Sequence, residues 1–74
     1  MKNRLDLHGV RHHQVPREVD KFIGEHLLKG TSEVSIITGH SDEMKNIVNK
    51  TLTDYGLYSE TLFNRETVLS VMLK

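Results

Sequence analysis

A chain of 74 residues without a cysteine can use neither disulfide bonds nor cysteine-ligated zinc to hold its fold. A domain of about this size buries only about 60% of the surface that its unfolded chain exposes, so it stands close to the limit of independent stability. Hydrophobic residues make up only 36% of the chain. We therefore expect one domain, residues 1–74, that commits nearly all of its apolar side chains to a single core.

Charge and hydropathy narrow the classes of protein further. Ten lysine and arginine residues balance ten aspartate and glutamate residues, so the formal net charge is zero. This balance argues against a strongly basic, histone-like nucleic-acid binder but leaves room for a local basic patch. No apolar stretch approaches the roughly 20 residues of a membrane span, and the apolar run near the N-terminus is too short for a signal peptide. We expect a complete cytoplasmic protein that does not enter a membrane, and the sequence leaves its oligomeric state open.

The first strand-like segment comprises residues 4–8, in which apolar and polar side chains alternate. A period of two predicts a β-strand with Leu5 and Leu7 on its buried face. Asp6 and His8 then share the opposite face.

Three further segments have strand-like composition. The first is rich in β-branched residues and ends at Gly39. The last two are separated by the polar residues 64–66, which predicts a tight antiparallel hairpin. The three segments are residues 33–38, 58–63 and 67–73.

Two segments have the spacing of amphipathic helices. One begins near Pro16, which a first helical turn tolerates, and runs to Gly30 with His26 beside its apolar stripe, partly buried. The other follows Ser41 as N-cap and stops at Gly56 as a left-handed C-cap. The residues expected in the apolar stripes are Val15, Val19, Phe22, Ile23 and Leu27, then Met44, Ile47, Val48 and Leu52.

This order of elements predicts a two-layer α/β fold, an α+β sandwich. Two helices cannot cover both faces of a four-stranded sheet, and right-handed crossovers place both on the same face. The first two strands are joined by a helical crossover, so they run parallel and end at one edge, where ligand sites are expected. We therefore predict a βαβαββ domain with a mixed four-stranded sheet, one open face, and His8, Gly9 and Gly39 together at that edge.

Two motifs resemble those of the Smr domain, the small MutS-related domain. Leu5-Asp6-Leu7-His8-Gly9 matches the family's LDLHG signature, and the strand ending in Ile36–Gly39 with the helix opened by Met44-Lys45 is similar to its second motif. The resemblance covers nearly the whole chain. It implies a fold similar to the C-terminal domain of bacterial translation initiation factor three. It also implies a nucleic-acid-processing module, because family members nick DNA, cleave RNA, or bind RNA in connection with the ribosome.

The chain departs from the family pattern in the second motif. Ser41 stands where the family usually has a second glycine, His40 replaces the common lysine, Lys45 replaces the usual arginine, and the loop is shorter. We expect a nucleic-acid-binding domain with endonuclease or phosphodiesterase activity on DNA or RNA. Two alternatives stay open: a non-catalytic binder of nucleic acid or the ribosome, and a small protein-interaction module that uses the open sheet face.

Asp6 and His8 are the residues predicted to carry catalysis. Two positions apart on one strand face, they are expected about 6 to 7 Å apart, which lets both contact one phosphodiester. His8 can transfer protons near neutral pH, while Asp6 can orient it, accept a proton from a water or a 2′-hydroxyl, or hold a divalent cation such as Mg²⁺ or Mn²⁺. The plainer alternative is that Asp6 pairs with a loop amide beside an ordinary exposed imidazole.

The predicted contacts to nucleic acid surround this pair. Gly39 permits close approach of a backbone, and the amides of residues 39–43 precede a helix N-terminus, which suits a phosphate. Asp42 and Glu43 oppose an anion there, and Lys45 offsets their charge. The residues predicted to bind nucleic acid are Gly9, Arg11, Gly39, His40, Ser41 and Lys45.

Two other kinds of site are not predicted. His12 and His13 lie near the same edge as His8 and His40, but adjacent loop histidines need not face one another, so we predict no zinc site built from these histidines. The four aromatic residues of the chain are too few and too core-like to form a base-stacking platform.

Overall fold

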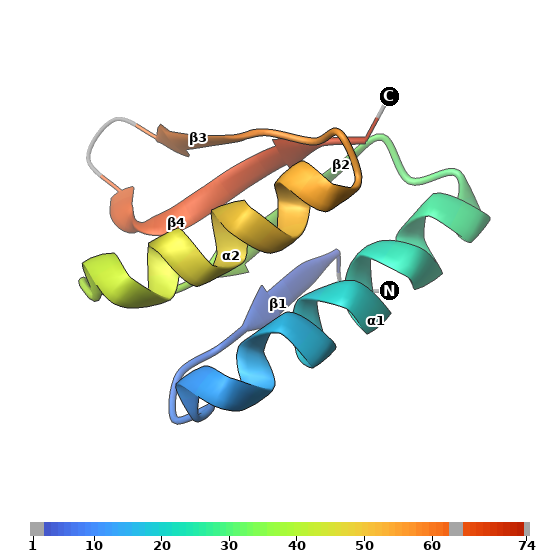
Figure 1. Cartoon of the computed structure of the whole chain (residues 1–74). Helices are drawn as coiled ribbons and strands as arrows, with labels where there is room; N and C mark the ends of the chain where they lie inside the picture. The colour runs from blue at the N-terminus through green and yellow to red at the C-terminus, as the bar shows by residue number, and fades with distance from the viewer. Residues whose placement is uncertain (1–2, 63–64, 74) are drawn as a thin grey trace.

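The computed structural model describes residues 3–62 and 65–73 and confirms the predicted two-layer fold. Both helices lie on one side of the sheet and pack against each other (Figure 1). The elements are β1 (Arg4–Asp6), the short 3₁₀ helix η1 (His12–Gln14), α1 (Val15–Lys29), β2 (Glu33–Ile37), α2 (Asp42–Asp54), β3 (Ser59–Leu62) and β4 (Arg65–Met72).

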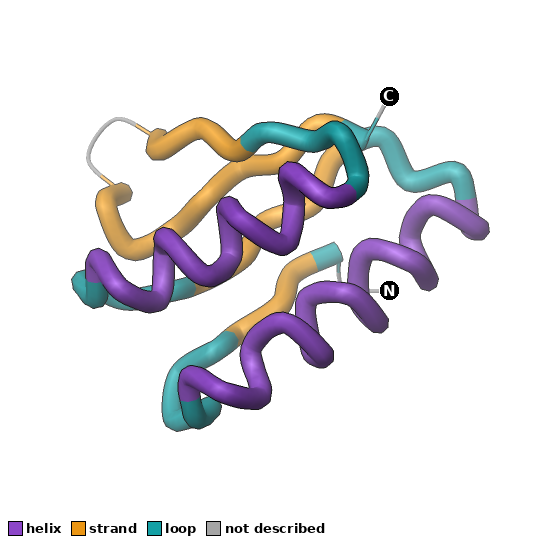
Figure 2. The backbone as a smooth tube through the Cα atoms, viewed as in Figure 1, coloured by secondary structure: helices purple, strands orange, loops and turns teal. Residues whose placement is uncertain are grey.

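The sheet has the strand order β1-β2-β4-β3 (Figure 2). β1 pairs in parallel with β2, and Leu5 lies opposite Ile36. β4 is antiparallel to both of its neighbours, as the predicted hairpin requires. The hairpin connection differs from the prediction because β4 already begins at Arg65, so Arg65 and Glu66 belong to the strand; Asn64 lies outside the described residues.

The core lies between the sheet and the two helices, where the apolar stripes predicted from the sequence meet. Leu7 is buried as expected, whereas Leu5 is only half-buried because β1 is a short edge strand. The buried hydrophobic residues are Leu7, Val15, Val19, Phe22, Ile23, Val34, Ile36, Met44, Val48, Leu52, Leu69 and Val71.

The stripe of α1 ends differently from the prediction. Leu27 was expected in the core but is 42% exposed, and His26 is buried in the last turn. The His26 ring packs edge-on against Phe22 with ring centroids 4.6 Å apart, and its Nδ1 lies 2.9 Å from the Thr31 hydroxyl oxygen. A histidine with a hydrogen-bond partner and an aromatic neighbour can therefore take the place that periodicity assigns to a leucine.

The aromatic residues also divide between core and surface. Phe22 is buried, but Tyr58 is 78% exposed and Tyr55 is 38% exposed, so the description of all four aromatics as core-like was wrong. Phe63 lies outside the described residues.

Candidate functional site

The LDLHG segment ends in a tight turn rather than a continuous strand. β1 stops at Asp6, whose Oδ1 accepts a hydrogen bond of 2.9 Å from the backbone N–H of His8. The N–H of Val10 donates to the carbonyl of Leu7 over 3.0 Å, and Gly9 has φ of +80° at the third position of this turn. That geometry favours glycine, because an L-residue with a Cβ is strained there.

This turn corrects the predicted geometry of Asp6 and His8. Both side chains are exposed, but His8 lies outside β1, so strand alternation does not set where its imidazole points. The side chain of Asp6 competes with the sheet ladder by bonding a backbone amide two residues along, as aspartate commonly does in turns. The structure thus supports the plainer alternative for Asp6, a pairing with a loop amide.

Leu7 anchors the turn to the body of the domain. Its side chain is 1% exposed, and its N–H donates to the carbonyl of Ile37 over 3.0 Å. The residues of the motif after Leu5 therefore have distinct local roles, since Asp6 closes the turn, Leu7 holds it in the core, and Gly9 reverses the chain. His8 is left at the surface with its side chain available to a ligand.

The second loop follows β2 and is hydrogen-bonded to β4. The N–H groups of Thr38 and Gly39 both donate to the carbonyl of Thr67, over 2.8 and 3.2 Å, and the Thr38 hydroxyl donates to the Gly39 carbonyl over 3.0 Å. Gly39 has φ of +74°. Its amide is already bonded within the protein, so the predicted donation from Gly39 to a phosphate does not fit this arrangement.

The N-terminus of α2 is capped as predicted. The Ser41 hydroxyl accepts a hydrogen bond of 3.0 Å from the N–H of Met44, which satisfies one of the free amides of the first turn. Asp42 and Glu43 are exposed in that turn, and Lys45 is half-buried one position further along.

A contact that the sequence did not predict joins the two loops. The His12 Nδ1 lies 3.4 Å from Glu43 Oε2, with the two side chains 42% and 73% exposed. Sequence reasoning considered His12 only as a zinc ligand, and no local pattern connects residues 31 positions apart. This contact links η1, which follows the LDLHG turn, to the start of α2.

Parallel pairing brings the predicted site residues to one edge. Asp6 lies opposite Ile37, so the turn at His8 and the loop at Gly39 leave neighbouring strand ends (Figure 1). Around them, Gly9, Arg11 and His40 are exposed, and Ser41 and Lys45 are half-buried.

Two other features are absent from the described part of the chain. In residues 3–62 and 65–73, no group of three or more histidine, cysteine, aspartate or glutamate side chains is arranged to hold a metal ion. None of the helices that the structure describes is long and apolar enough to cross a membrane.

Comparison with known proteins identifies the family of this chain. The family model described as the Smr domain matches residues 5–67, a range that includes both loops. The chain belongs to the Smr domain family. Smr domains generally bind nucleic acid or resemble nucleases, and the matched range covers the LDLHG turn, the Gly39 loop and the start of α2.

A solved structure agrees with this fold. The Smr domain is similar to the crystal structure of YdaL, a stand-alone small MutS-related protein from Escherichia coli, with a TM-score of 0.79 and 24% sequence identity. The alignment covers 97% of this chain and 64% of the YdaL chain, so the Smr domain spans less than two thirds of that protein's length. At this identity the likeness shows a shared fold. No curated protein sequence matches the chain.

Proposed function

We propose that this Smr domain binds nucleic acid at the edge formed by the LDLHG turn and the Gly39 loop, and cleaves a phosphodiester bond there. One observation carries the proposal: the parallel pairing of β1 and β2 presents the exposed His8, Arg11 and His40 beside the start of α2. Imidazole, guanidinium and ammonium groups suit the phosphate backbone, which supplies most sequence-independent affinity.

The local hydrogen bonds divide the roles of Asp6 and His8. In our proposal the exposed His8 imidazole transfers a proton during cleavage. Asp6 is a positioning residue, because its Oδ1 is bonded to the His8 amide and so fixes the turn that carries the imidazole. This division favours the orienting role among those that the sequence left open for Asp6.

Charge at the start of α2 limits how strongly the site attracts an anion. Asp42 and Glu43 oppose the positive end of the helix, while Lys45 on the same turn supplies a cation. The contact between His12 and Glu43 partly neutralises one of these carboxylates whenever His12 is protonated. Binding then depends on a few phosphate contacts, in keeping with a net charge of zero.

The test is a joint measurement of binding and cleavage on supercoiled plasmid, single-stranded DNA and structured RNA, with Mg²⁺, with Mn²⁺ and with a chelator. His8→Ala is expected to lower the cleavage rate by at least about a hundredfold while binding persists. His13→Ala is the matched control, because His13 is also an exposed histidine but lies outside the turn. Unchanged cleavage by His8→Ala would remove His8 from the chemistry.

Two Asp6 variants separate positioning from proton transfer or metal binding. Asparagine keeps an oxygen that can accept from the His8 amide, so Asp6→Asn should retain most of the activity, and Asp6→Ala should lose it. Equal loss in both variants would show that the carboxylate charge itself is required.

A non-catalytic nucleic-acid binder is the second candidate. The hydrogen bond between the His8 amide and the Asp6 carboxylate favours this candidate, because Asp6 Oδ1 already accepts a hydrogen bond from the protein itself. Wild-type domain that binds nucleic acid without cleaving any of the substrates would establish this alternative.

A further inference from the structure

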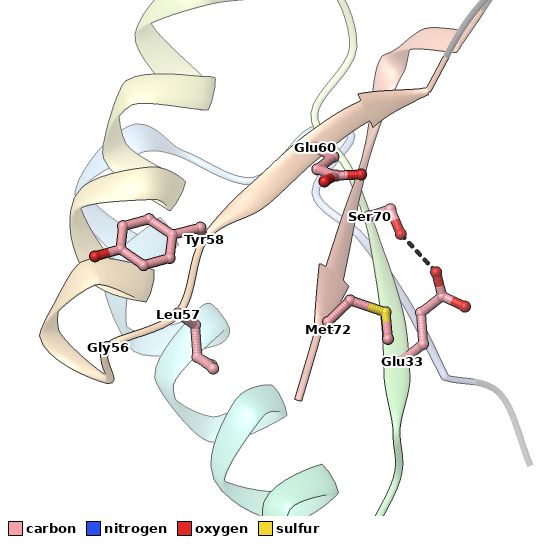
Figure 3. Close-up of a pocket in the computed structure, with 7 residues that line it drawn as sticks. All are labelled: Glu33, Gly56, Leu57, Tyr58, Glu60, Ser70 and Met72. Atoms are coloured by element: carbon pink, nitrogen blue, oxygen red, sulfur yellow. Dashed lines mark hydrogen bonds between the residues drawn. The ribbon is translucent and has the colours of Figure 1, made fainter. Parts of the chain in front are cut away.

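A groove lies at the opposite end of the sheet from the proposed nucleic-acid edge. It has a volume of about 330 Å³ and is lined by residues from the start of β2, the end of β4 and the segment that enters β3 (Figure 3). We call it the Glu33–Glu60 groove; its lining includes Glu33, Leu57, Tyr58, Glu60, Ser70 and Met72.

Exposed apolar side chains line part of this groove. Met72 is 55% exposed, although it is a large residue that a domain with a small core would be expected to bury. Leu57 adds a half-buried apolar surface to the lining. Tyr58 is 78% exposed, but its ring is turned toward α2, away from Met72 and the two glutamates (Figure 3). Neighbouring exposed apolar residues rimmed by polar groups are typical of interaction sites.

Two carboxylates flank the same groove. Ser70 lies opposite Glu60 in the sheet register, and its hydroxyl donates to Glu33 Oε2 over 2.8 Å. This bond holds the Glu33 carboxylate over β4, so Glu33 and Glu60 lie on either side of Ser70 (Figure 3). Within the described residues, neither carboxylate forms an ion pair with a lysine or arginine.

We propose that the Glu33–Glu60 groove docks an extended basic segment of a partner protein. Two carboxylates on either side of Ser70, with no basic partner among the described residues, attract a lysine or arginine side chain placed between them. The Met72 side chain and the partly buried Leu57 offer apolar contact to its neighbours. The same negative charge disfavours nucleic acid, so this surface is separate in chemistry as well as place from the proposed cleavage site.

The experiment titrates the ¹⁵N-labelled domain with a capped synthetic peptide, Gly-Arg-Val-Arg-Val-Arg-Gly, and follows amide chemical shifts. A peptide with glutamate in place of each arginine is the charge control. We expect shifts centred on Glu33, Glu60, Ser70 and Met72, no binding of the acidic peptide, and weaker binding as salt rises.

Variants then test each part of the groove. Glu33→Gln and Glu60→Gln should each weaken peptide binding by about threefold, and the double variant by about tenfold, as exposed ion pairs do. Glutamine at position 33 can still accept from the Ser70 hydroxyl, so the local fold should persist. Glu25→Gln is the matched control, because it removes one exposed carboxylate from α1.

Three results would overturn the proposal. One is the absence of shifts in the groove at millimolar peptide. Another is affinity unchanged in the double glutamine variant, whose dispersed amide spectrum shows that it is folded. The third is nucleic acid that displaces the peptide from the groove. None of them bears on cleavage by His8, so failure here is distinguishable from failure of the proposed function.

Discussion

The turn that ends the LDLHG segment makes Gly9 a sensitive position for stability. Its φ of +80° costs an L-residue with a Cβ about 1 to 2 kcal/mol. A Cβ placed there meets no other atom within 4 Å, so the expected loss comes from backbone strain alone. Alanine also lowers the entropy of the unfolded chain, which offsets about 0.4 to 1 kcal/mol. Gly9→Ala should therefore lower the free energy of unfolding by about 1 kcal/mol.

Gly24→Ala is the matched control for this substitution. Gly24 lies within α1, and its Cβ position also meets no atom within 4 Å. Because alanine is a better helix former than glycine, Gly24→Ala should stabilise the domain by about 0.5 to 1 kcal/mol. In a domain of this size 1 kcal/mol moves the melting temperature by about 4 to 8 °C, so the two variants should differ by about 10 °C.

The assay is thermal unfolding followed by far-ultraviolet circular dichroism, with urea unfolding as a second measure of stability. Gly39→Ala should behave like Gly9→Ala, because Gly39 has φ of +74° and equally open surroundings. A Gly9→Ala variant as stable as Gly24→Ala would refute the assignment of this turn and of the role we give to Gly9.

Three other outcomes are expected. Ser41→Ala removes the acceptor for the Met44 amide and should destabilise the domain by about 1 kcal/mol in urea unfolding, whereas Ser41→Asp should not. The hydrogen bond from the Tyr55 hydroxyl to the Asp20 carboxylate raises the pKa of Tyr55 above its usual 10.0, and this contribution to stability is present below that pH and lost as pH rises through the raised pKa. The stability advantage of wild type over Tyr55→Phe in urea should accordingly be present at neutral pH and shrink in alkali. Nucleic-acid affinity measured against salt should give a log–log slope of about −2 to −4, and Lys45→Ala should weaken binding and reduce the slope by about 1.

Local patterns in the sequence determined the elements of this protein. These patterns are local, because each involves residues that are close together in the sequence. They are the alternation at Leu5 and Leu7, the helical spacing of the two apolar stripes, and a serine before an acidic turn. Element order then restricts the topology, because crossovers are right-handed and the short connections allow few arrangements. The mixed sheet, the shared face of both helices and the edge that gathers the two motifs follow from these rules, and the structure has all three.

Only the tertiary structure decided which hydrogen bonds the polar groups at that edge form. The Asp6 carboxylate bonds the His8 amide instead of extending the strand, and the Gly39 amide bonds the carbonyl of Thr67, which is distant in the sequence. Likewise, the contact between His12 and Glu43 depends on the packing of the helices. Each polar group can form a hydrogen bond with any of several partners. Which bond forms depends on partners from other elements, and these are brought near only when the sheet has formed. For that reason the sequence predicts which residues gather at the edge, whereas the fold determines which of their polar groups are left for a ligand.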